Sequence, residues 1–186
     1  MLETLNISEI VTILKTTGIY LIGIDGRDGS GNSKLASLIS QELGCPHVNI
    51  DDLVDKNCGQ YVNYIHYDRL LMELDDAKGP MIIEGVCLLA VLERMDRNLD
   101  MLIYIKRVSG YGMWRDEDDY NISEDIDHFM NKKKEEFQKF VEIDAYIEGE
   151  DTSGVSNFPR FTEEIIRYHH KYRPHEKADI IYKRII

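Results

Sequence analysis

Short apolar runs alternate with amphipathic stretches along most of this chain. Runs of mostly apolar residues, bounded by glycine or polar residues, predict buried strands at residues 19–25, 47–50, 81–83, 101–105 and 179–182. Between and before them, apolar residues recur at helical spacing. This predicts helices near residues 5–17, 33–43, 67–78, 86–95 and 161–172, the first capped by Ser8 and stopped at Gly18.

The alternation of strand and helix predicts an α/β fold with three layers. We expect a parallel five-stranded sheet with helices on both faces, because each parallel connection needs a crossover helix. Residues 1–186 are predicted to form one domain, with an acidic helical insert or lid at about 108–160. Ligands of such folds bind beyond the carboxyl ends of the strands.

The charge balance argues against two classes of binding partner. The chain carries 22 basic and 34 acidic residues, a formal charge of −12. Nucleic acid and anionic membranes would be repelled, so neither is expected as a partner. No apolar run approaches the ~18 residues of a membrane span. The three cysteines suggest neither a disulfide framework nor a zinc site, and with an N-terminus unlike a secretion signal they favour a reducing cytoplasm.

Most of the excess charge lies in one segment. Residues 116–151 contain 14 acidic and 4 basic residues, a net charge of −10. Apolar residues still recur there at near-helical spacing, which predicts a long surface helix with a solvated acidic face. The pair His169-His170 lacks a third partner at metal-ligand spacing, so it is also assigned to a solvated helix face.

The segment GIDGRDGSGNSKLA (residues 23–36) carries the strongest motif. It fits the phosphate-loop pattern G-x-x-x-x-G-K-[ST] between a predicted strand and a predicted helix, with one departure. Glycines let backbone N–H groups approach an oxyanion, and the helix N-terminus adds further donors. The alternative is a glycine-rich turn without a ligand. The predicted nucleotide-binding residues are Gly26, Arg27, Asp28, Gly29, Ser30, Gly31, Asn32, Ser33 and Lys34.

The departure is Asn32, which stands where the pattern has lysine. An amide donates hydrogen bonds but brings no positive charge to the β- and γ-phosphates. Lys34 follows two residues later, about 200° around a helix, and is expected to point away from them. Losing the lysine is expected to cost ~10²–10⁴-fold in rate, by analogy with the loss of a positioned donor. Ser33 would place its hydroxyl on a Mg²⁺ ion.

Acidic residues follow two of the predicted strands. Asp51 and Asp52 end the second strand, where their side chains should diverge to opposite faces. One could accept the proton of a substrate hydroxyl, although an Asp pair also caps helices and turns. Glu84 follows the third strand. It could hold a Mg²⁺-bound water, or it could be a solvated strand end.

Aromatic residues cluster after the second predicted strand. Tyr61, Tyr64, His66 and Tyr67 could stack on a base or sugar, and the last three are candidate substrate-binding residues together with Asp51 and Asp52. The alternative for each is ordinary packing, with Tyr67 beside Leu70 and Leu71 in the core.

Taken in order, the segments IGIDGRDGSGNSKLASLI, NIDDL, YDRLLMEL and PMIIEGVCLL resemble the uridine kinase-like branch of the P-loop small-molecule kinases. The later segment YHHKYRPHEKADIIY resembles the end of bacterial members. The similarity covers roughly residues 17–107 and 165–184. It implies a parallel five-stranded core and Mg²⁺-dependent transfer of phosphate from ATP to a hydroxyl of a nucleoside or similar small molecule.

The resemblance also implies roles for individual residues. Gly26, Gly29 and Gly31 would line the phosphate cradle, and Ser33 would bind Mg²⁺. Asp51 matches the aspartate that acts on the substrate hydroxyl, and Glu84 matches an acidic residue associated with the metal. The family's loop lysine and its arginine-rich lid have no clear counterparts, and Lys106, Arg107 and Arg115 lie near the place of the lid.

The predicted function is therefore an ATP- and Mg²⁺-dependent kinase of a small molecule, with Asp51, Asn32 and Arg107 as candidate catalytic residues. Two alternatives remain open. One is a binding protein that keeps the fold and transfers phosphate poorly. The other is a kinase of a non-nucleoside metabolite such as a sugar acid or vitamin. The chain could form a homo-oligomer.

Overall fold

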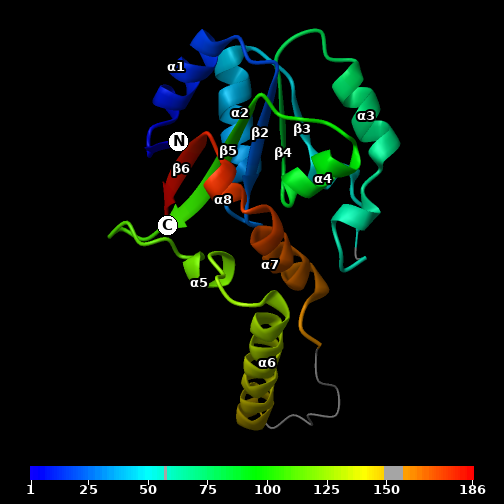
Figure 1. Ribbon diagram of the computed structural model, residues 1–186, viewed down its shortest axis with the longest axis vertical. Helices are drawn as coiled ribbons and strands as arrows, with labels where there is room; N and C mark the ends of the chain where they lie inside the picture. The colour runs from blue at the N-terminus through cyan, green and yellow to red at the C-terminus, as the bar shows by residue number, and fades with distance from the viewer. Residues whose placement is uncertain (57, 149–156) are drawn as a thin grey trace.

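The computed structural model describes residues 1–56, 58–148 and 157–186. Six parallel strands form one sheet in the order β1-β6-β5-β2-β4-β3 (Figure 1). The strands are β1 (Leu2–Thr4), β2 (Leu21–Gly26), β3 (His47–Asn49), β4 (Met81–Gly85), β5 (Met101–Val108) and β6 (Ile180–Ile185). The helices are α1 (Ile7–Thr17), α2 (Asn32–Leu43), α3 (Tyr67–Asp75), α4 (Leu88–Arg94), α5 (Glu117–Tyr120), α6 (Ile126–Glu148), α7 (Arg160–Tyr172) and α8 (Pro174–Lys177).

The sheet separates two hydrophobic clusters, and this confirms the predicted three-layer α/β fold. Successive strand residues enter opposite clusters, as the neighbours Ile82 and Ile83 do in β4. Helices α1 and α2 cover one face, while α3, α4 and α7 cover the other. Because both faces are buried, the strands read as continuous apolar runs in the sequence.

The sheet has six strands, where five were predicted. The additional strand, β1, pairs with β6 and places Leu2 opposite Ile180. A strand of three residues is too short to show alternation, and apolar positions at helical spacing begin directly after it. The N-cap of α1 also lies two residues earlier than predicted. Asn6, rather than Ser8, is the N-cap, and its side chain accepts a hydrogen bond from Ser8 N at 2.9 Å.

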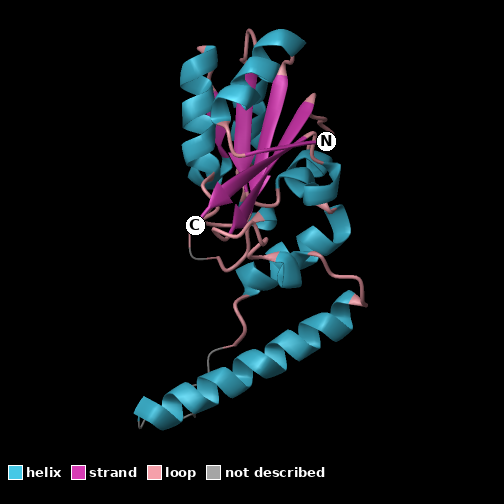
Figure 2. Ribbon diagram, turned by 90° about the vertical axis from the view of Figure 1, so that its left-hand side faces the viewer, coloured by secondary structure: helices cyan, strands magenta, loops and turns pink. Residues whose placement is uncertain are grey.

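The acidic segment forms two helices instead of one. Residues between α5 and α6 interrupt the helix, and Asp125 Oδ1 accepts hydrogen bonds from the backbone N–H groups of Asp127 and His128 at the start of α6. Helix α6 extends away from the sheet (Figure 2). Its first turns pack on the core through Phe129 and Met130, while Phe140 is 66 % exposed. Residues 149–151 of the acidic segment lie outside the described residues.

None of the helices in the described part of the chain combines the length and the hydrophobicity that crossing a bilayer requires. The three cysteines, Cys45, Cys58 and Cys87, carry free thiols.

Candidate active site

A loop at the carboxyl end of β2 leads directly into α2. Gly29 and Gly31 in this loop have φ angles of +72° and +99°, which favour glycine. A Cβ at Gly31 would also lie 2.6 Å from Nη1 of Arg184. That guanidinium binds the carbonyl oxygens of Gly29 and Ser30 at 3.2 and 2.7 Å. The loop is therefore held by its carbonyl groups.

The backbone N–H groups of the same loop are largely free. Ser30 N donates to Arg27 O at 2.9 Å. Among the described residues, the N–H groups of Arg27, Asp28, Gly29, Gly31, Asn32 and Ser33 have no protein acceptor. Free N–H groups at the start of a twelve-residue helix favour an anion, because the helix dipole adds partial positive charge there.

Asn32 serves the loop's internal structure. Its side chain is buried, and Oδ1 accepts a hydrogen bond from the Ser30 hydroxyl at 2.8 Å. Its Nδ2 donates at longer range to Gly26 O and Gly85 O, at 3.4 and 3.3 Å. The amide thus joins the loop to the end of β4. Lys34 is exposed on the side of α2 that faces Ile7 of α1.

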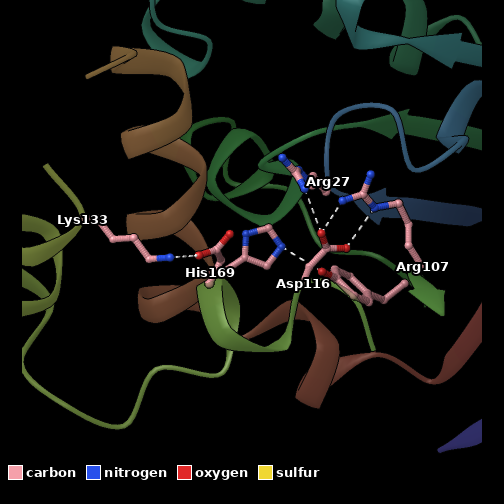
Figure 3. A network of polar contacts seen from close by, with 7 residues as sticks. Arg27, Arg107, Asp116, Lys133 and His169 are labelled. Atoms are coloured by element: carbon pink, nitrogen blue, oxygen red, sulfur yellow. Dashed lines mark hydrogen bonds and ion pairs between the residues drawn. The ribbon is translucent and has the colours of Figure 1, made fainter. Parts of the chain in front are cut away.

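Two arginines at the loop share one carboxylate (Figure 3). Arg27 Nη1 lies 2.9 Å from Oδ1 of Asp116, and Arg107 Nε lies 3.0 Å from Oδ2. Asp116 is 4 % exposed. Burial opposes its ionisation, but the hydrogen bonds from Arg107 and Arg27 outweigh it and lower the pKa of Asp116. Two candidate phosphate-binding cations therefore lie beside the loop, both paired with a residue of the acidic segment.

Glu84 and Ser33 offer oxygen atoms beside the loop. Glu84 lies inside β4 and is 1 % exposed, so it is not the solvated strand end that remained open as an alternative. Burial, and the charges of Asp51 and Asp52, raise its pKa to about 7, while a hydrogen bond with the Ser33 hydroxyl acts in the opposite direction. Its Oε1 is buried without a hydrogen-bond partner among the described residues. An unpartnered buried carboxylate oxygen is the kind of group a metal ion or its bound water would satisfy.

These two residues fit Mg²⁺. The ion prefers oxygen ligands and usually keeps several waters, so one or two protein groups and the substrate phosphates suffice to hold it. In the described part of the chain, no three or more His, Cys, Asp or Glu side chains converge as a metal-binding group.

Asp51 and Asp52 lie in a short 3₁₀ helix (Ile50–Leu53) and not at the end of an extended strand. The prediction that the two side chains diverge to opposite faces assumed an extended strand and was therefore wrong. In a 3₁₀ helix, neighbouring side chains point about 120° apart. Tyr61 donates its hydroxyl hydrogen to Asp51 Oδ1 at 2.6 Å. Burial and the charge of Asp51 raise the pKa of Tyr61, so this phenol remains protonated.

A cavity of about 440 Å³ lies beside Asp51. Asp28 of the phosphate loop forms part of its wall, so the cavity borders both this loop and the Asp51 carboxylate. The rest of the lining is mixed, with apolar side chains (Val54, Val86, Phe161) and polar or charged ones (Asp55, Lys56, Gln60). A small molecule bound here could present a hydroxyl to Asp51 while lying next to the loop.

Of the predicted aromatic group, Tyr61 lines this cavity, whereas Tyr64, His66 and Tyr67 do not. Tyr64 is exposed, His66 Nε2 lies 3.0 Å from Asp55 Oδ1, and the Tyr67 hydroxyl donates to Val62 O at 2.8 Å. The aromatic residues of the cavity wall are Tyr61 and Phe161, with ring centroids 6.0 Å apart. Phe161 is 100 positions away in sequence, so local spacing could not indicate it.

Asp25 was missed by the sequence analysis. It is fully buried at the end of β2 and accepts hydrogen bonds from Gly26 N at 2.7 Å and from the Tyr168 hydroxyl. Burial raises its pKa to about 7, against the effect of these hydrogen bonds. The only sequence signal is a carboxylate inside an apolar run, which is rare unless the group is paired.

His169 is also buried, so its assignment to a solvated face was wrong. Its ring stacks on Tyr120 with centroids 3.8 Å apart, and its nitrogens lie within 2.9 Å of Tyr104 Oη and Ile165 O. Burial lowers the pKa of His169 to about 3. The polar side chain of His169 therefore points from α7 into the core, where ring contacts and hydrogen bonds compensate for its desolvation.

This histidine gives a prediction for stability against pH. A histidine whose pKa is lowered by folding stabilises the protein fully above its unfolded pKa of about 6.5, and this contribution is lost as the pH falls toward the folded value. Between pH 6.5 and 5 the loss is about 2 kcal/mol. Urea unfolding at both pH values should show that His169→Phe loses about 2 kcal/mol less than the wild type. Equal losses in the two proteins would contradict the buried neutral imidazole.

Comparison with known proteins gives the fold. The chain is similar to the structure of a protein from Bacillus stearothermophilus described as a possible uridine kinase, with a TM-score of 0.50 and 15 % identity over 95 % of this chain and 96 % of that one. It also matches a protein from Silicibacter described as a candidate fructose transport system kinase, with a TM-score of 0.44 and 13 % identity over 96 % of this chain and 100 % of that one. No protein-family model matches the chain, and neither does any curated protein.

The chain has the P-loop kinase fold. The comparison and the parallel sheet flanked by helices both show it. The likeness extends over nearly the whole of both chains, but an identity of 15 % supports the fold and not a shared activity.

Proposed function

We propose that the protein is a phosphotransferase that moves the terminal phosphate of ATP to a hydroxyl group of a small molecule, as in uridine kinases. One observation supports this most directly. Asp28 of the loop with free N–H groups and Asp51 line the same cavity, and the charge of Asp51 acts on Glu84, the hydrogen-bond partner of Ser33. A nucleoside is the first candidate acceptor, since the Bacillus stearothermophilus protein is described as a possible uridine kinase.

Each part of the site has a task in such a reaction. Phosphoryl transfer depends on positioning and on neutralising charge. The loop N–H groups would hold the β- and γ-phosphates, and Arg27 and Arg107 would add the positive charge that Asn32 lacks. Mg²⁺ bound near Ser33 and Glu84 would offset further negative charge on the phosphates.

Asp51 would hold the acceptor hydroxyl in line and accept its proton. Its Oδ1 is paired with the Tyr61 hydroxyl, and its other oxygen would accept the hydrogen bond and the proton of the substrate hydroxyl in the adjoining cavity. Because the Tyr61 phenol stays protonated, it can only donate to Asp51 and does not compete for the substrate's proton.

Calorimetry with ATP and Mg²⁺, followed by turnover with a nucleoside panel, tests the proposal. We expect nucleotide binding that weakens without Mg²⁺ and a phosphorylated product from at least one acceptor. Binding without turnover on nucleosides or on a wider metabolite panel would instead indicate the binding protein. Products from sugar acids or vitamins alone would indicate the non-nucleoside kinase. Absence of nucleotide binding would overturn both kinase readings.

A further inference from the structure

One face of α7 touches both halves of the site. Phe161, Glu164 and Tyr168 are spaced three and four residues apart, which places them on the same side of a helix. Phe161 lines the acceptor cavity. The two polar residues of this stripe bind backbone or carboxylate groups on different elements of the site.

Glu164 connects α7 to the wall of the acceptor cavity. Its two carboxylate oxygens accept hydrogen bonds from the backbone N–H groups of Tyr61 and Val62, at 2.6 and 3.0 Å. The side chain of the same tyrosine donates to Asp51 at 2.6 Å. The position of Asp51 is thus tied to α7 through one residue, Tyr61, which is 5 % exposed and has little freedom to move.

Tyr168 connects α7 to the start of the phosphate loop. Its hydroxyl donates to Asp25 and accepts a hydrogen bond from Leu89 N at 3.1 Å. Asp25 in turn accepts from Gly26 N at 2.7 Å, at the first residue of the phosphate loop. Asp25 and Tyr168 are almost completely buried, so water does not substitute readily for either group.

We propose that Glu164 and Tyr168 are positioning residues through which α7 fixes the placement of Asp51 relative to the phosphate loop. The role in transfer rests on the proposed function, while the mechanical connection does not. In-line transfer depends steeply on this placement, since a shift of about 1 Å can cost ~10²-fold in rate. The connection explains why a helix far along the chain carries two polar side chains toward the sheet.

Amide hydrogen exchange followed by NMR tests the connection without requiring activity. Glu164→Gln keeps the shape of the side chain but leaves one of its two N–H partners without an acceptor. If α7 transmits the change, exchange at Gly26 should rise about tenfold or more. In the reciprocal experiment, Tyr168→Phe should raise exchange at Tyr61 and Val62 by a similar factor.

Two substitutions on the same helix serve as controls. Glu163→Gln removes a carboxylate that pairs with Lys134 and Arg167, and Tyr172→Phe removes a hydroxyl that donates to Glu93. The phenyl ring left at position 172 keeps its packing on Tyr168, whose centroid lies 5.1 Å from that of Tyr172, and Glu163 pairs with Lys134 and Arg167 away from the site. Neither variant should therefore change exchange at Gly26, Tyr61 or Val62. The proposal would be overturned if each substitution changed amide exchange only on its own side of the site. It would also be overturned if the control variants changed exchange by the same amount. If Tyr168→Phe does not fold, the response of Gly26 to Glu164→Gln decides.

Kinetics add the second readout. With an acceptor that the wild type phosphorylates, Glu164→Gln and Tyr168→Phe should each lower kcat about 10–100-fold and change nucleotide Kd less than about threefold. The double variant should fall little below the worse single one, because either change already releases the spacing. Multiplied effects, or changes in acceptor KM alone, would contradict a positioning role. A wild type without any transfer would refute the proposed function and leave the exchange result standing.

Discussion

Asp51→Asn is expected to lower the rate of phosphoryl transfer about 10²–10⁴-fold, while nucleotide affinity changes less than about threefold. The amide oxygen of asparagine can still accept the hydrogen bond from Tyr61, so the local structure should persist. What is lost is the ability to accept the proton of the acceptor hydroxyl. Transfer rates under saturating ATP and Mg²⁺, with calorimetry for nucleotide binding, measure the two effects separately.

Asp52→Asn is the matched control. Asp52 is the next residue of the same 3₁₀ helix, it is exposed, and it does not line the cavity. Removing its charge should change the rate less than about threefold. Unchanged turnover in Asp51→Asn, or equal losses in the two variants, would remove Asp51 from the proposed role.

Asn32→Lys is expected to raise the transfer rate at least about tenfold. The lysine would restore a positive charge aimed at the β- and γ-phosphates, where charge develops in the transition state. The variant should lose some stability, on the order of 1 kcal/mol, because the hydrogen bonds that join Asn32 to Ser30 and to the end of β4 disappear. Steady-state kinetics and thermal unfolding measure the two opposing effects.

Asn32→Gln separates charge from connection. It disturbs the same hydrogen bonds without adding charge, so it should lose stability and gain no activity. An Asn32→Lys variant with unchanged or lower turnover, together with a folded Asn32→Gln variant, would mean that side chain 32 does not face bound phosphate. Arg27 and Arg107 would then supply the positive charge alone.

The phosphate loop could be predicted from sequence because its chemistry is local. Glycines at fixed spacing, a preceding apolar run and a following amphipathic helix all lie within residues 19–43. In the structure, most N–H groups of the loop have no protein acceptor among the described residues, and α2 begins directly after the loop, at Asn32. Lys34 lies on the side of α2 that faces Ile7 of α1. Ser33 and Glu84 do meet, although they are separated by 51 positions, because parallel strands bring their carboxyl ends to one edge.

The partners of the charged residues could not be predicted in the same way. Asp116 belongs to a segment whose composition indicates a solvated face, yet it is buried between Arg27 and Arg107. The first of these pairs spans 89 positions. The sum of charges over a segment describes its average exposure and not the fate of a single carboxylate that meets two guanidinium groups.

The amino-acid order alone determined the layered fold and the glycine geometry of the phosphate loop, because strand and helix periodicity and glycine-dependent backbone geometry are properties of neighbouring residues. Only the tertiary structure decided which side chains complete the site. Tyr61 of the predicted aromatic group lies in the cavity wall beside the distant Phe161, and α7 brings Glu164 and Tyr168 to two separate elements. Such contacts depend on how distant segments pack, which no local pattern encodes.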